Sequence, residues 1–173
     1  MLKTAGLDWT VEKIPTYAQI DGNQVYSGHD ALVRSIDNKV LDVVPNSWHH
    51  MQNLDAFEFF NEFVHAGDMS MNTAGSLKGG QIVWALAKVD DDFEILNGDK
   101  VEPYLLFSNP HEYGKCIDIR FTAIRVVCNN TLTMALGATS DMVVRLNHRR
   151  TFDGDLVKRT LGVAHTKMST YKE

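Results

Sequence analysis

The sequence predicts an α+β fold in which a mostly antiparallel sheet packs against two or three helices. Segments of alternating apolar and polar residues, separated by turn signals, indicate antiparallel strands. After Pro45 the apolar residues recur at every third or fourth position, which indicates a helix. The chain has 173 residues and is 44% hydrophobic, so it can bury the core of a single domain.

The first strands are expected before Pro45, where Gly, Asn and Asp residues mark turns between apolar segments. The second of these turns is short enough to predict a hairpin. The expected strands are Val11 to Ile20, Val25 to Tyr26, Ala31 to Ile36 and Val40 to Val44, and the turns are Asp21 to Asn23 and Asp37 to Asn38.

The first helix is expected to begin with Asn53 as its capping residue and to end before Gly67. Asp55 in the first turn suits the positive end of the helix dipole. The helix is rich in aromatic residues, which predicts that it packs against the sheet. Its apolar residues are Leu54, Phe57, Phe59, Phe60, Phe63 and Val64.

Three more strands are expected at Met69 to Gly75, Gln81 to Val89 and Val101 to Phe107, with a turn from Lys78 to Gly80 between the first two. The loop from Asp90 to Asp92 is acidic, but it lacks the glycine and the distal glutamate of a calcium-binding EF-hand loop. We therefore predict no metal site.

Charge is distributed unevenly along the chain. The net charge of −5 argues against a general nucleic-acid binder. Residues 145–173, however, carry seven Lys/Arg against three Asp/Glu, or +4, whereas residues 1–144 carry ten against nineteen, or −9. We interpret residues 1–144 as an α+β core and residues 145–173 as a basic C-terminal helical extension of the same domain. A solvated amphipathic helix explains the same charges.

The extension also has an apolar stripe within the helix expected from Asp153 to Met168. A stripe of this kind needs a partner surface, in the chain or in a neighbour, so we expect a homo-oligomer. Its members are Leu156, Val157, Leu161, Ala164 and Met168.

The sequence predicts a cytoplasmic protein without a membrane partner. No apolar run approaches the ~18 residues that cross a bilayer, and the opening residues lack the apolar stretch of a secretory signal. The two cysteines, Cys116 and Cys128, cannot build a disulfide framework or a typical zinc site. We expect both to be reduced and to lie in the core.

The segment from Cys116 to Gly137 is the most informative for function, because a long strand leads directly into a helix. Alternation places Ile117, Ile119, Phe121 and Ala123 on an apolar face, and Cys116, Asp118, Arg120 and Thr122 on a polar face. The same alternation places Arg125 on the apolar side, where its charge would need a carboxylate, carbonyl groups or a bound anion.

The start of this second helix is a candidate anion site. Asn129, Asn130 and Thr131 offer capping side chains, and the first amides of a helix attract negative charge. With Arg120 or Arg125 beside them, these amides could hold a phosphate. The alternative is an arginine paired internally with an aspartate, next to an ordinary helix cap.

No standard catalytic motif is present, which argues against enzyme activity but leaves it open, and we predict no cofactor. GxSxG, Walker, HExxH, CxxC and GxGxxG patterns are all missing from the sequence. His111 is a weak candidate for a general base. The neighbours His49 and His50 would point to opposite sides of an extended chain, which makes them a poor chelate.

Four passages resemble the phage/plasmid-like protein family known as domain of unknown function 932. They are AGLDWTVEKIPTY, TAGSLKGGQIVWALAKV, DKVEPYLLFSNPHE and AIRVVCNNTLTMAL, and they span about residues 5 to 137. Asn109 to Glu112 departs from the Asn-Ser-His-Asp pattern of that family. Because many members have a segment before AGLDW, we expect a short version of the family or an excerpt of a longer member.

The resemblance implies a phage- or plasmid-type protein, and the coarse order of elements is similar to the single-strand annealing recombinases. Our hypothesis is a protein that binds single-stranded nucleic acid in annealing or recombination, with Trp48 and Tyr104 as candidate base-stacking residues. The residues expected to contact phosphates are Arg120, Arg125, Asn129, Asn130 and Thr131, with a basic rim of Arg145, Arg149, Arg150, Lys158 and Arg159.

Two alternatives stay open. A non-catalytic phage protein could bind or inhibit a host defence protein through its acidic body, or the chain could bind a small phosphorylated ligand at the helix start. A continuous basic groove would favour nucleic acid, and a closed pocket lined by Arg125 and Asn129 would favour a metabolite. An exposed apolar patch would favour a protein partner.

Overall fold

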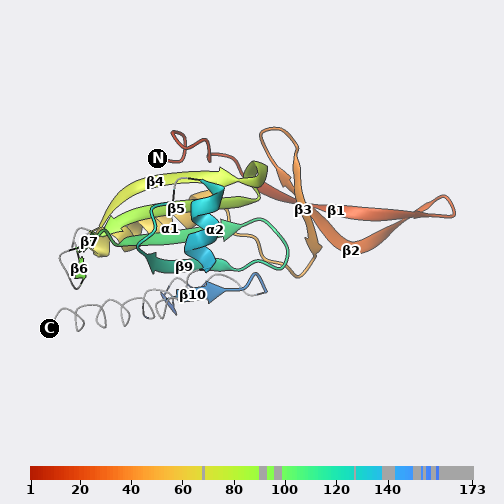
Figure 1. Ribbon diagram of the computed structural model, residues 1–173. Coiled ribbons are helices and arrows are strands. Elements are labelled where there is room, and N and C mark those ends of the chain that lie inside the picture. Colours follow the sequence, from red (N-terminus) through yellow and green to blue (C-terminus); the bar gives the residue numbers. More distant parts are fainter. Residues whose placement is uncertain are drawn as a thin grey trace.

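The structure is a computed structural model that describes residues 1–67, 69–89, 93–95, 99–126, 128–137, 143–149, 153, 155–156 and 159. Its strands pair antiparallel in a five-stranded sheet, a three-stranded sheet and a two-stranded ribbon (Figure 1). The described residues also form two α-helices. The predicted α+β class is therefore confirmed, with the strands divided between separate sheets.

The elements follow one another with short connections. In chain order they are β1 (Val11–Ile20), β2 (Asn23–Arg34), β3 (Val40–Pro45), α1 (Asn53–Ala66), β4 (Met69–Leu77), the 3₁₀ turn η1 (Lys78–Gly80), β5 (Ile82–Val89), β6 (Phe93–Ile95), β7 (Asp99–Val101), β8 (Tyr104–Pro110), β9 (Ile117–Thr122), α2 (Asn129–Gly137) and β10 (Val143–Leu146).

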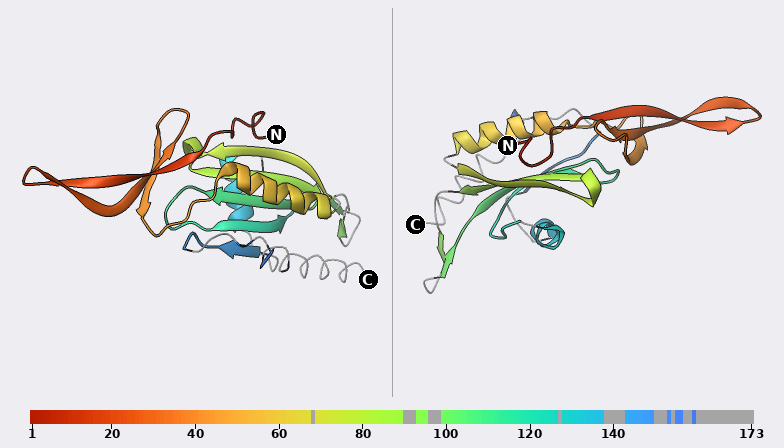
Figure 2. Two further views of the ribbon diagram at one scale, coloured as in Figure 1. Left: turned by 180° about the vertical axis from the view of Figure 1, so that it is seen from behind. Right: turned by 90° about the horizontal axis from the view of Figure 1, so that it is seen from above.

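The five-stranded sheet is the centre of the molecule, with the order β10-β9-β8-β5-β4. Helix α1 covers one face and α2 the other (Figure 2, right). Neighbouring residues of the central strands point to opposite faces, so Ala85 and Phe107 join the α1 core while Trp84 and Leu106 join the α2 core. Burial on both faces explains the apolar runs at 82–87 in β5 and 104–107 in β8.

The hairpin of β1 and β2 extends away from the rest of the chain (Figures 1 and 2). β3 pairs with β2 from His29 to Val33, which is the base of the hairpin. β2 runs without a break from Asn23 to Arg34, so the predicted segments Val25 to Tyr26 and Ala31 to Ile36 belong largely to one strand. We call residues 15–28 the arm.

The first helix differs from its prediction at its start. Gln52 is the capping position of α1, and Asn53 is the first helical residue. The Asn53 amide is buried and donates to the carbonyl oxygens of Leu7 and Trp9, at 3.2 and 3.4 Å. It therefore ties the N-terminal segment to the helix instead of capping it. The predicted end at Gly67 is confirmed.

The apolar stripe of α1 is confirmed for most of its members. Phe57, Phe59, Phe60 and Val64 are buried against the sheet. Leu54 is exposed, whereas Asn53 and Ala56 in the same turn are buried, so Leu54 lies on the outer side of the helix.

The strand predicted from Val101 to Phe107 is divided in the structure. Val101 ends β7 and Tyr104 begins β8. Pro103 lies between them and has no N–H for a strand ladder, which is consistent with a break at this point.

Two predictions for the segment around β9 are wrong. β9 ends at Thr122, so strand alternation does not reach Arg125, which is exposed in the following loop. Cys116 and Cys128 are free but exposed, because they lie in loops at the ends of β9 and α2 and not within either element.

The C-terminal part can be compared with its prediction at only a few positions. Asp155, Leu156 and Arg159 are helical, and the rest of the helix expected from Asp153 to Met168 lies mostly outside the described residues. Among the described residues, no helix combines the length and apolar character needed to span a bilayer.

Candidate functional site

Three adjoining hollows lie along β10 and the loop before β9. Their volumes are about 670, 610 and 500 Å³. The first and second share Arg145, the second and third share Lys115, and the first and third share Arg149. The hollows therefore adjoin one another around β10, the first on the α1 side of the sheet and the second on the α2 side, and we call the three together the basic groove.

The exposed basic side chains of the groove come from four places in the chain. Lys78 lies in η1, Lys115 in the loop between β8 and β9, Arg145 in β10, and Arg149 just after β10. β5 and β8 pair with Ile82 opposite Pro110, so the turn before β5 and the loop after β8 meet at one edge of the sheet. Antiparallel pairing thus gathers charges that are far apart in sequence.

The groove has a positive balance in an otherwise acidic chain. Five Lys/Arg side chains line the three hollows, namely the four exposed ones and the buried Arg120, against Asp55, Asp118 and Asp153. The chain as a whole carries −5. Positive charges that gather in a concave surface strengthen the local electrostatic field, so the groove is suited to attract an anion.

Arg120 lies at the bottom of the groove and is only 1% exposed. Its Nε and Nη2 atoms each donate to the Asp118 carboxylate at 2.6 Å. Its Nη1 atom donates to the carbonyl oxygens of Ala135 and Leu136, at 3.1 and 2.8 Å. The structure therefore shows the internal pairing that the sequence left as the alternative, and Arg120 fastens the C-terminal end of α2 to the sheet.

Arg145 contacts the same carboxylate from the surface. Its Nε donates to Oδ2 of Asp118 at 3.1 Å, while 62% of its side chain stays exposed. Asp118 thus orients an exposed arginine at the point where the first and second hollows meet. The outer nitrogens of that guanidinium remain accessible to a ligand.

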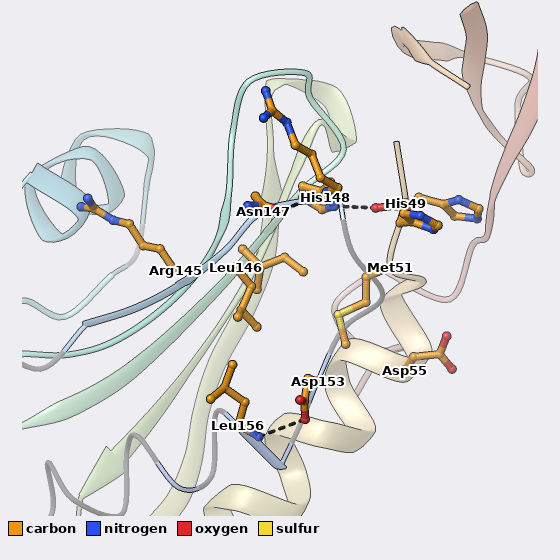
Figure 3. A pocket seen from close by; sticks show the side chains of 12 residues that line it. His49, Met51, Asp55, Arg145, Leu146, Asn147, His148, Asp153 and Leu156 are labelled. Atoms are coloured by element: carbon orange, nitrogen blue, oxygen red, sulfur yellow. Dashed lines mark hydrogen bonds between the residues drawn. The ribbon is translucent and has the colours of Figure 1, made fainter. Parts of the chain in front are cut away.

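The first hollow lies between α1 and β10 (Figure 3). Met51 and Leu146 contribute apolar side chains, and His148 borders the hollow with its ring stacked on Trp48 at 4.0 Å between centroids. His148 Nδ1 donates to the carbonyl oxygen of His49 at 2.7 Å, so its Nε2 carries the lone pair. Burial lowers the pKa of His148, which keeps this ring neutral near pH 7.

Tyr113 is the exposed aromatic residue of the third hollow, beside Lys115. Its backbone N–H donates to the Asp42 carboxylate at 2.6 Å, which fixes the loop. The stacking candidates named from the sequence, Trp48 and Tyr104, are both buried. Tyr113 was missed because a single tyrosine in a turn gives no pattern in the sequence.

A family model for a domain of unknown function, DUF932, matches residues 40–173. The chain belongs to this family. The match confirms the resemblance carried by three of the four passages, and the passage AGLDWTVEKIPTY lies before it. No curated protein and no solved structure matches the chain significantly.

In this DUF932 chain the predicted site residues divide between two ends of the sheet. Arg120, Arg145 and Arg149 line the groove. Arg125 acts electrostatically on Glu102 and Tyr104, at the opposite end of β8 from Lys115. The structure therefore does not bring Arg120 and Arg125 together at one site.

The start of α2 is capped by side chains of its own segment. The Thr131 hydroxyl accepts the Cys128 N–H at 3.1 Å and donates to the Cys128 carbonyl at 3.0 Å. Hydrogen bonds from Thr131 and from the Asn130 N–H lower the pKa of the Cys128 thiol. Asn129 begins the helix and Asn130 is exposed. The start of α2 in this DUF932 chain therefore stabilises the thiolate form of Cys128 relative to that of an ordinary cysteine.

The remaining predicted residues lie in the C-terminal segment. Arg159 is exposed in a helical position, whereas Arg150 and Lys158 lie outside the described residues. Lys78 and Lys115 were missed by the sequence analysis. Pairing of β5 with β8 would have revealed them, since it brings the two loops together, but single-sequence patterns do not report which strands are neighbours.

Proposed function

We propose that this DUF932 domain binds single-stranded nucleic acid along the basic groove. The observation that carries the proposal is a set of three hollows that adjoin around β10 and are bordered by Lys78, Lys115, Arg145 and Arg149. A row of separated cations suits a phosphate backbone better than a single phosphate, because successive phosphates need successive partners.

Tyr113 favours a single strand over a duplex. Its ring is exposed beside Lys115, and an unpaired base can stack on an aromatic ring while its phosphate contacts the neighbouring cation. The bases of a duplex are stacked on one another and do not offer their faces in this way.

The acidic character of the rest of the chain shapes the expected affinity. With a net charge of −5, attraction is confined to the groove, and release of counterions from the phosphates should dominate binding. We expect weak, sequence-tolerant and strongly salt-dependent binding. A role in annealing or recombination, and a phage or plasmid origin, stay predictions of the sequence.

The rival proposals rest on other features. A small phosphorylated ligand would need the closed pocket lined by Arg125 and Asn129, and exposed Arg125 gives it little support. A host protein as partner would need an exposed apolar patch, and the arm provides one at a distance from the groove.

The experiment is fluorescence anisotropy of labelled single-stranded and duplex oligonucleotides with the wild type and with Lys115→Ala/Arg149→Ala. Both side chains are exposed, so the double variant should fold normally. We expect at least a tenfold loss of single-strand affinity, about 1.4 kcal/mol. Lys3→Ala is a control for loss of one surface charge, because Lys3 is exposed and is not among the residues that line the three hollows. Equal binding by all three proteins would contradict the proposal.

A further inference from the structure

The arm is the largest feature of the fold that the proposed function does not use. β1 and β2 continue past the end of β3 as a ribbon of two strands (Figure 1). Every residue from 17 to 27 is exposed. A two-stranded ribbon is marginal in water, because neither of its faces is covered.

The arm exposes apolar side chains that a solitary surface loop would not need. Tyr17, Ile20, Val25 and Tyr26 are 56%, 52%, 47% and 42% exposed. A whole aromatic side chain buries about 150 to 250 Å² in a contact, so the two tyrosines alone offer roughly 200 Å². Exposed apolar area concentrated in this way marks an interaction surface.

The arm is also nearly free of charge. Asp21 is the single charged residue between Ile14 and Gly28, in a chain of which 23% of the residues are charged. This composition does not suit a nucleic acid or an anionic membrane as the partner. It does suit a second copy of the chain, since two copies that each carry −5 can approach most closely where the charge is lowest.

The backbone of the arm offers a matching edge. β1 is an edge strand of its sheet, so among the described residues the N–H and C=O groups on its outer side have no strand partner. Proteins protect such edges with proline and lysine. Lys13 and Pro15 protect the base of β1, but from Thr16 to Ile20 the edge carries neither.

From these features we infer that the arm is a self-association surface on which β1 pairs edge to edge with β1 of a second copy. Antiparallel pairing of identical strands is self-complementary and closes as a two-fold dimer. Side chains of both faces then meet across the new strand pair, which covers Tyr17 on one face and Ile20 on the other.

The contact is short, so the dimer should dissociate on dilution. About five residues of each strand take part. The area that they bury is therefore smaller than the ~800 Å² per partner of a typical stable interface. We therefore expect a dissociation constant in the micromolar range.

The test is sedimentation equilibrium of the full chain from about 5 µM to about 500 µM. The wild type should rise from the mass of one chain, 19.5 kDa, toward twice that mass. Tyr17→Lys/Ile20→Lys should raise the dissociation constant at least tenfold, because lysines at the new strand pair repel one another. Ile20→Lys alone keeps the ring contact of Tyr17 with Tyr26 and should act in the same direction.

Ile36→Lys is the matched control. Ile36 is 65% exposed but lies in the turn between β2 and β3, away from the arm. A chain that stays monomeric at every concentration would overturn the inference and would leave a different protein as the partner of the arm. Self-association that the arm variants do not weaken would overturn it as well, because another surface would then be responsible.

Discussion

The Asp118 carboxylate joins two arginines of different exposure, with Arg120 buried at 2.6 Å and Arg145 on the surface at 3.1 Å. One residue therefore fastens the sheet to α2 and also places a cation in the groove. This relationship connects the stability of the fold with the geometry of the proposed binding surface.

Asp118→Asn should destabilise the protein strongly. The change removes the carboxylate charge that pairs with two nitrogens of the buried Arg120 guanidinium, and losing one partner of a buried ion pair costs roughly 3 to 5 kcal/mol. The measurement is the free energy of unfolding in urea. Arg145→Ala is the comparison, since its exposed ion pair should contribute less than about 1 kcal/mol. Similar small losses in both variants would contradict the assigned role of Asp118.

Removing the ring of Tyr113 should weaken single-strand binding without affecting the fold. An aromatic platform contributes roughly 1 to 3 kcal/mol per stacked base, so Tyr113→Ala should lower the affinity between about fivefold and a hundredfold. Tyr113→Phe retains the ring and should bind like the wild type. Anisotropy with single-stranded oligonucleotides measures both. If Ala and Phe behave alike, Tyr113 is not a stacking residue.

Stability should decrease as the pH falls below about 6.5. Burial lowers the pKa of His111 from 6.5 to about 3, so the folded chain binds this proton less readily than the unfolded chain. The stability is fully present above the unfolded pKa and is lost progressively as the pH falls toward the folded pKa.

At about pH 4.5, two units below the unfolded pKa, protonation of His111 should have lowered the free energy of unfolding by roughly 2 to 3 kcal/mol. Burial lowers the pKa of His50 and of His148 as well, so both contribute with the same sign. Urea unfolding at several pH values measures the slope of the free energy of unfolding against pH. His111→Gln should reduce the slope whatever it does to stability at pH 7, and an unchanged slope would place the effect elsewhere.

Cys128 should react with alkylating agents faster than Cys116, although both are exposed. Hydrogen bonds from the start of α2 lower the pKa of the Cys128 thiol and so increase its thiolate fraction at neutral pH. Mass spectrometry after brief treatment with iodoacetamide compares the two sites. Thr131→Ala should slow Cys128 and Thr131→Ser should not, and equal rates at both cysteines in the wild type would argue against the assigned hydrogen bonds.

Much of the fold was predictable from local pattern. Apolar strand-like segments between turn signals located β1, β4 and β5, and helical spacing located α1, because these patterns depend only on the local sequence. Local pattern did not predict that Asp118 and Arg120 would be buried. They stand on what looked like a polar strand face, and α2 covers that face only in the folded chain.

The groove was predicted only in part, for a related reason. Charge counting identified Arg145 and Arg149, because the C-terminal segment is basic as a whole. Lys78 and Lys115 stand alone in acidic or neutral surroundings, and pairing of distant strands is what brings them to the same edge. Arg125 was misplaced because the sequence does not show that β9 ends at Thr122.

The most direct test of the proposed binding surface is the salt dependence of single-strand affinity. Four exposed cations that each neutralise one phosphate predict a slope of log K against log salt of about −3. This is the steepest slope expected, because Lys78 already pairs with Glu112 and Arg145 with Asp118. Lys115→Ala/Arg149→Ala should reduce the slope to about half of that value. Absence of binding at low salt, or an unchanged slope in the double variant, would contradict the account of the basic groove as a nucleic-acid surface.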